Sequence, residues 1–145
     1  MVIDSSALLA IVLAEPDATL YIEAIDRALQ RKQRICVPVS VILEAGIVAD
    51  RRGRGQILNT LLERLQPEIP VFDQRLTNLS RHLFWRYGRG QHAASLNFGD
   101  CMSYAAAEYL GPPLLFKGED FSRTPVTPAL PQTARIHLCN SVVKC

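Results

Sequence analysis

The sequence lacks three features that would place it in a specialised class of proteins. Its longest uninterrupted apolar run covers residues 7–14, far short of the ~18 residues of a membrane-spanning helix, so we expect no membrane span. Its start has neither a basic segment nor a small-residue cleavage site, so we expect no signal peptide and a soluble, cytoplasmic protein. Its net charge is only +2, which by itself points to no polyanionic or polycationic partner.

Cysteine is scarce and scattered. The four cysteines, Cys36, Cys101, Cys139 and Cys145, contain no C-x-x-C pair, which argues against a zinc site. We expect reduced thiols, with Cys36 and Cys101 filling the core. The rest of the composition, 48% apolar and 21% charged over 145 residues, is typical of one globular domain.

Short apolar runs alternate with amphipathic segments along the chain. The pattern predicts strands at about residues 1–4, 35–39, 68–72 and 114–116, with a short fifth strand within 124–130. Helices are expected between them, and Asp17 and Ser40 are expected to cap two of these helices. This order predicts an α/β fold for residues 1–130, with three α/β/α layers and a mostly parallel central sheet of four to five strands. Residues 131–145 lack periodicity, and we expect a poorly ordered tail there.

Asp4 lies where the first strand passes into a helix. In a parallel sheet this is the carboxyl edge, where ligands and metals bind. Aspartate is also a preferred helix N-cap, and a structural role is the favoured explanation of Asp4 when it is considered alone.

Two further acids stand in comparable positions. Glu44 lies in the apolar helix after the second strand, and no cation stands three or four residues from it. A capping box with Ser40 would need its acid one residue earlier, at position 43. Asp100 follows Asn97 by three residues, so it fits a capping pair as well as a ligand role.

The fourth acid follows the strand at 114–116, where Glu119 and Asp120 are adjacent. Right-handed crossovers bring the carboxyl ends of parallel strands to one edge, so Asp4 and Asp120 are expected to meet there. Carboxylates gathered in one cleft repel one another unless a cation neutralises them, and their oxygens suit Mg²⁺ or Mn²⁺. Such ions activate water and stabilise charge in phosphodiester hydrolysis.

The residues around these acids resemble those of PIN-domain ribonucleases, and more narrowly the VapC toxins of bacterial toxin–antitoxin pairs. The resemblance covers residues 1–130 and is carried by Val2-Ile3-Asp4-Ser5-Ser6-Ala7, Glu44-Ala45, Asn97-Phe98-Gly99-Asp100-Cys101 and Leu114-Leu115-Phe116-Lys117-Gly118-Glu119-Asp120-Phe121. It implies that the catalytic, metal-binding acids are Asp4, Glu44, Asp100 and Asp120. By the same resemblance Ser6 supports the site, and Asp120 is favoured over Glu119 because it precedes Phe121.

The resemblance also implies a function and partners. The function is that of a Mg²⁺-dependent endoribonuclease toxin of a type II system, which hydrolyses RNA by metal-activated water, with Mn²⁺ able to substitute. The partners are transfer or ribosomal RNA, a VapB-like antitoxin that inserts a basic segment into the cleft, and a second copy in a homodimer. The alternatives are a catalytically inert PIN-like module that binds RNA or protein, and a weaker one, an aspartyl phosphotransfer domain.

The stretch from Gln74 to Gly99 carries arginines, histidines and aromatic residues but no acid. Such a stretch can neutralise phosphates and stack bases, which makes Arg81, Arg86 and Arg89 candidates for RNA binding. An ordinary exposed helix face explains the same pattern, with an inward side formed by Leu76, Leu79, Leu83 and Trp85. The sequence leaves both interpretations open.

Overall fold

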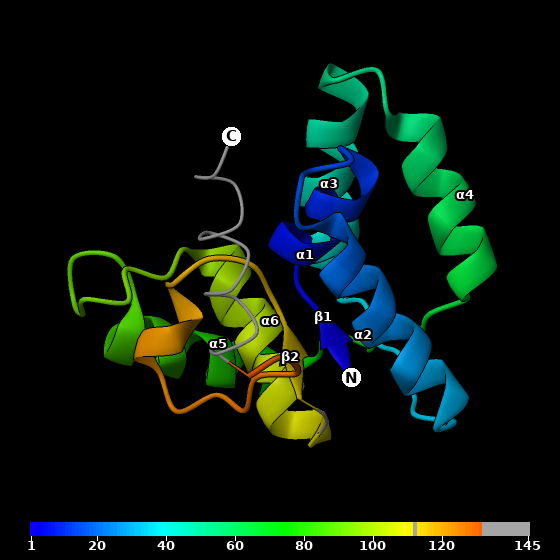
Figure 1. The fold of residues 1–145 in the computed structure, drawn as a ribbon. Coiled ribbons are helices and arrows are strands. Elements are labelled where there is room, and N and C mark those ends of the chain that lie inside the picture. Colours follow the sequence, from blue (N-terminus) through cyan, green and yellow to red (C-terminus); the bar gives the residue numbers. More distant parts are fainter. Residues whose placement is uncertain (112, 132–145) are drawn as a thin grey trace, which may run out of the picture.

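The structure is a computed structural model that describes residues 1–111 and 113–131 (Figure 1). Within these residues six α-helices surround a two-stranded parallel sheet. The elements in chain order are β1 (Val2–Ile3), α1 (Ser5–Val12), α2 (Ala18–Gln30), α3 (Val39–Arg51), α4 (Gly55–Leu65), α5 (Gln74–Tyr87), α6 (Phe98–Leu110), β2 (Leu114–Leu115) and the 3₁₀ turn η1 (Phe121–Arg123).

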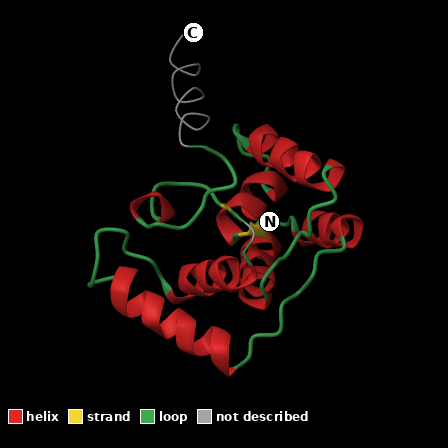
Figure 2. Cartoon of the chain, turned by 90° about the horizontal axis from the view of Figure 1, so that it is seen from below, coloured by secondary structure: helices red, strands yellow, loops and turns green. Residues whose placement is uncertain are grey.

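The strands lie between two helical layers. Helices α1 to α4 gather on one side of β1 and β2, and α5 and α6 on the other (Figures 1 and 2). Successive strand residues point to opposite faces of a sheet, so Val2 and Leu114 pack into the core of α5 and α6. Ile3 and Leu115 pack into the core of α1 to α4. The predicted α/β fold with a parallel sheet covered on both faces is therefore confirmed.

The predicted number of strands was wrong. Within the described residues the sheet contains β1 and β2 only, rather than four to five strands. The other expected strands contribute isolated parallel bridges, Val2 to Cys36, Cys36 to Glu68, and Leu114 to Pro128. Proline has no N–H to donate to a ladder, and these segments contain Pro38, Pro70, Pro125 and Pro128, so pairing does not extend along them.

Two predicted helix caps also differ. Helix α3 begins at Val39 with Pro38 in the N-cap position, so Ser40 lies inside the helix. The Ser40 hydroxyl is buried and has no hydrogen-bond partner among the described residues. Asp17 does precede α2, but its carboxylate makes no capping bond. It accepts a hydrogen bond from the Tyr21 hydroxyl at 3.2 Å and pairs with Lys117, so a tertiary contact takes the place of the cap.

The core contains many of the predicted apolar residues, but not all of them. Cys36 and Cys101 are buried free thiols, as expected, whereas Cys139 and Cys145 lie outside the described residues, with most of the predicted tail. Leu76 and Leu83 on α5 are buried, but Trp85 is 70% exposed, so its predicted inward orientation was wrong. In the described part of the chain no helix is both long and apolar enough to span a bilayer.

Candidate metal-binding active site

Asp4 is a buried carboxylate at the end of β1. Its side chain caps α1, since Oδ2 accepts hydrogen bonds from the Ser6 amide at 3.0 Å and from the Ser6 hydroxyl at 2.6 Å. Its own amide donates to the Leu115 carbonyl at 2.9 Å, which ties it to β2. Asp4 is only 2% exposed. The sequence offered a cap or a site residue at this position, and the observed geometry is compatible with both roles.

Ser6 connects the ends of the two strands. Its Oγ donates to Asp4 after β1 and accepts from the Lys117 amide at 3.0 Å, shortly after β2. A hydroxyl can donate and accept at once, which is what this position uses. The bonding pattern therefore suits the supporting role predicted for Ser6.

Asp100 closes a reciprocal capping box at the start of α6. Its Oδ2 accepts from the Asn97 amide at 2.7 Å, and the Asn97 Oδ1 accepts from the Asp100 amide at 2.9 Å. The capping pair predicted from sequence is thus confirmed. Asp100 is half-buried.

The other three predicted acids act electrostatically on Asp100. The pKa of Asp100 is raised to about 7, chiefly by burial and also by the negative charges of Asp4, Glu44 and Asp120, against the lowering effect of the hydrogen bond from Asn97. These acids lie after β1 and β2, in α3 and in α6, so charges from distant parts of the chain act on Asp100.

Glu44 approaches the start of α6 because residue 99 is a glycine. Glu44 is half-buried on α3, and its Oε2 would lie 3.2 Å from a Cβ atom added at Gly99. The Asn97 Oδ1 would lie 3.1 Å from the same atom, so a side chain here would crowd both groups. Sequence reasoning did not give Gly99 this role, since the close approach of α3 to α6 is a tertiary feature.

Asp120 is exposed and precedes η1. The turn is anchored by Phe121, which is buried and packs its ring 4.9 Å from that of Phe116. Glu119 is also exposed, but it is absent from the charges that raise the Asp100 pKa, whereas Asp120 is among them. This difference supports the choice of Asp120 over its neighbour.

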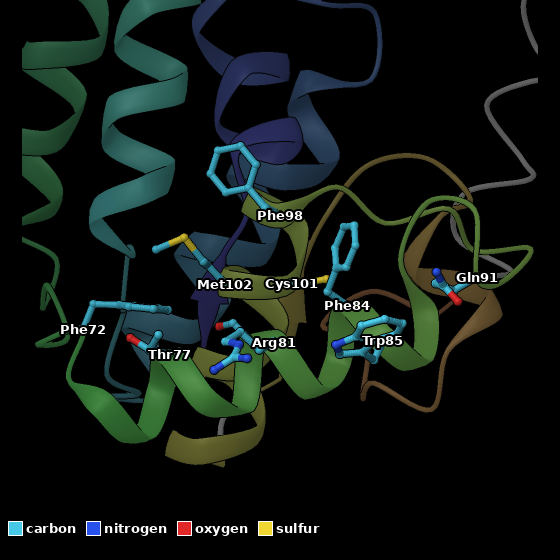
Figure 3. A pocket seen from close by; sticks show the side chains of 10 residues that line it. Phe72, Thr77, Arg81, Phe84, Trp85, Gln91, Phe98, Cys101 and Met102 are labelled. Carbon is cyan, nitrogen blue, oxygen red and sulfur yellow. The ribbon is translucent and has the colours of Figure 1, made fainter.

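The candidate RNA-binding arginines are all exposed. Arg81 lies with Trp85 in a groove of about 450 Å³ between α5 and α6, where the lining is mainly apolar (Figure 3). Arg86 lines a different concavity and places its guanidinium carbon 5.3 Å from the Tyr87 ring centroid. Arg89 follows α5, and its amide donates to the Leu96 carbonyl at 2.9 Å.

The acids suit a hard divalent cation by their chemistry and their charge. All four offer carboxylate oxygens, the ligands that Mg²⁺ and Mn²⁺ prefer. Across residues 1–111 and 113–131 none of the ion pairs includes any of the four. In the same residues no three His, Cys, Asp or Glu side chains form a ready-made ligand cluster. Among the described residues, therefore, the charges of Asp4, Glu44 and Asp120 act on Asp100, and none of these four acids is part of an ion pair.

Comparison with known proteins identifies the protein family of this chain and then a group within that family. Residues 1–126 match the PIN domain family. The chain is 40% identical over 129 residues to Ribonuclease VapC of Mycolicibacterium smegmatis. This match covers 87% of this chain and 97% of that protein. It is 38% identical over 135 residues to Ribonuclease VapC30 of Mycobacterium tuberculosis, with coverage of 90% and 100%.

A solved structure titled as a toxin-antitoxin complex from Klebsiella pneumoniae contains a chain of the same fold, with a TM-score of 0.62 at 17% identity. The match covers 86% of this chain and 92% of that chain. The chain belongs to the PIN-domain family and, within it, to the VapC group. The family resemblance predicted from the acids and their flanks is confirmed.

Proposed function

We propose that this protein is a Mg²⁺-dependent endoribonuclease and the toxin of a type II toxin–antitoxin pair. The observation that carries the proposal is the match of residues 1–126 to the PIN domain family. The raised pKa of Asp100, to which burial and the charges of Asp4, Glu44 and Asp120 contribute, supports it. A strongly perturbed carboxyl among other acids is typical of a catalytic or metal-binding site. The relatives named Ribonuclease VapC support RNA as the substrate.

The chain's own residues hold and orient the site. Ser6 fixes the Asp4 carboxylate, Gly99 gives Glu44 room beside α6, and the Phe116–Phe121 contact anchors the turn that carries Asp120. In this proposal Asp4, Glu44, Asp100 and Asp120 bind the metal. When bound, Mg²⁺ supplies the positive charge that activates water and stabilises the entering and leaving oxygens. Mn²⁺ substitutes because it accepts the same oxygen ligands.

The proposed partners follow from charge. Four acids that form no ion pair with any of the described residues suit an antitoxin segment that is basic, and the similar fold of a chain from a toxin-antitoxin complex supports such a partner. Arg81, Arg86 and Arg89 lie on or just after the acid-free helix α5 and are proposed to contact the phosphates of a transfer or ribosomal RNA in the cytoplasm.

We also propose a homodimer of PIN domains that span residues 1–130. Val39, Leu43 and Ile47 are exposed at four-residue spacing on α3, so they share one face of that helix. Phe98, at the start of the neighbouring helix α6, is 75% exposed. Exposed apolar residues on one face are typical of a protein–protein interface.

Cleavage of purified transfer and ribosomal RNA tests the activity. We expect cleavage in Mg²⁺ or Mn²⁺, none in excess EDTA, and full recovery when the metal is restored. Cleavage that is undiminished in EDTA contradicts the metal site. A chain that binds RNA but leaves it intact at every metal concentration supports the inert binding module instead.

A further inference from the structure

Lys117 is bonded at both its backbone and its side chain. Its amide donates to the Ser6 Oγ at 3.0 Å. Its ammonium group lies between two carboxylates, bonded to Glu15 and, at 2.7 Å, to Asp17 Oδ1. One residue therefore contacts the start of α1 and the connection between α1 and α2 at the same time.

The ion cluster is partly shielded from solvent. The side chains of Lys117, Glu15 and Asp17 are 34%, 35% and 24% exposed. Asp17 is held further by the hydroxyl of buried Tyr21, which donates to its other oxygen at 3.2 Å. An ammonium shared by two fixed carboxylates is more strongly restrained than one in a single exposed ion pair.

Lys117 also stands at the base of the segment that carries Asp120. Gly118 follows with a φ of +89°, and Asp120 comes two residues later, before η1. Asp120 is exposed, so its place relative to Asp4 depends on how the two ends of this short segment are held. Phe121 holds one end by packing on Phe116, and Lys117 holds the other.

We propose that Lys117, clamped by Glu15 and Asp17, is a positioning residue that sets the Asp120 segment against the Ser6–Asp4 pair. The effect of this positioning on catalysis rests on the proposed ribonuclease function. Both partners of the ammonium are carboxylates of the same chain, so Lys117 acts through geometry rather than by binding an RNA phosphate.

The test compares the variant Lys117→Met with Lys117→Arg in the full chain. Methionine keeps an unbranched stem but loses the charge, whereas arginine keeps the charge. For Lys117→Met we expect kcat to fall about tenfold with KM within about twofold, because misplaced groups slow the chemical step more than they weaken binding. We expect Lys117→Arg to recover most of kcat. The double variant Glu15→Gln with Asp17→Asn should reproduce the loss seen with methionine.

Amide hydrogen exchange tests the clamp without any cleavage. In Lys117→Met we expect faster exchange across residues 117–121, with unchanged exchange in α5 and α6. Unchanged exchange at 117–121 overturns the clamp, whatever the activity. Faster exchange with wild-type kcat overturns the catalytic positioning. If the wild-type chain itself cuts no RNA, the proposed function fails, whereas the exchange measurement still decides on the clamp.

Discussion

Asp100 and Asn97 bond to each other in both directions, since the Asp100 carboxylate accepts from the Asn97 amide and the Asn97 side chain accepts from the Asp100 amide. A carboxylate offers about four acceptor positions, and the cap takes one of them on Oδ2. Capping and metal binding are therefore compatible at Asp100. The cap fixes the direction of the carboxylate, which is a useful property in a ligand.

The raised pKa of Asp100 predicts how the metal-free protein responds to pH. Burial and neighbouring negative charges raise the Asp100 pKa from 3.8 to about 7, so folding favours the protonated form. The stability that this group contributes is fully present below its unfolded-state pKa and is lost as the pH rises through about 7. We expect the free energy of unfolding, measured with urea in EDTA, to fall over this range.

The variant Asp100→Asn is the control for the pH measurement, because it removes the titrating group. Its free energy of unfolding should change less between about pH 4 and about pH 7 than that of the wild type. In the wild type, added Mn²⁺ should restore the free energy of unfolding that is lost at the upper end of this pH range, because a ligand that binds only the folded state stabilises it. A pH dependence that is the same in the variant and the wild type contradicts the assignment to Asp100.

Neighbouring acids at the end of β2 allow a matched pair of substitutions. Asp120 contributes to the charge around Asp100 and Glu119 does not, although both are exposed. We expect Asp120→Asn to lower kcat for RNA cleavage at least about a hundredfold and Glu119→Gln to change it by less than about threefold. Calorimetric titration with Mn²⁺ should show weaker binding in the first variant only. The reverse ranking would make Glu119 the fourth acid.

Local sequence patterns predicted the parts of the site that depend on nearby residues. The Asn97–Asp100 cap involves side chains three residues apart, so the sequence was enough to predict it. The position of Asp4 after a strand followed equally from a short apolar run. Strand number was beyond such reasoning, because segments that contain proline resemble strands in composition but pair only through isolated bridges.

Contacts between distant residues could not be predicted. Lys117 and Asp17 are 100 residues apart, and no local pattern pairs them. The error at Trp85 has a different cause. Trp85 follows Leu83 by only two residues, which places it on the side of α5 opposite to Leu76 and Leu83, and it is 70% exposed.

Removal of the Ser6 hydroxyl should disturb both strand ends. Ser6→Ala deletes the donor to Asp4 Oδ2 and the acceptor for the Lys117 amide. We expect a loss of about 1–3 kcal/mol in the free energy of unfolding, since partly buried polar groups lose their partner. We also expect a clear fall in kcat at unchanged KM. The conservative variant Ser6→Thr keeps the hydroxyl and should retain most activity; equal losses in both variants would show that the hydroxyl is not the reason.

The exposed face of α3 predicts where the homodimer forms. Leu43 is 65% exposed at the centre of the Val39–Leu43–Ile47 row, so a charge there costs the folded monomer little but would be buried in a dimer. Sedimentation velocity should show Leu43→Lys as a monomer with an unchanged melting temperature. Ile57 on α4 is 43% exposed and serves as the control, because Ile57→Lys changes a different face. If only the Ile57→Lys variant were monomeric, the dimer interface would lie on α4.

The salt dependence of RNA binding distinguishes a phosphate contact from an ordinary surface arginine. Arg81 is exposed on acid-free α5 beside the groove that also holds Trp85. If it contacts a phosphate, Arg81→Gln should weaken RNA binding and reduce the slope of log K against log salt by roughly 0.7–0.9.

The measurement uses fluorescence anisotropy in Ca²⁺, a hard cation with the same oxygen preference, at several salt concentrations. Arg31, exposed at the end of α2, gives the matched control Arg31→Gln, which should leave the slope unchanged. Equal slopes in the wild type and in both variants would leave Arg81 as a solvated residue of an exposed helix face.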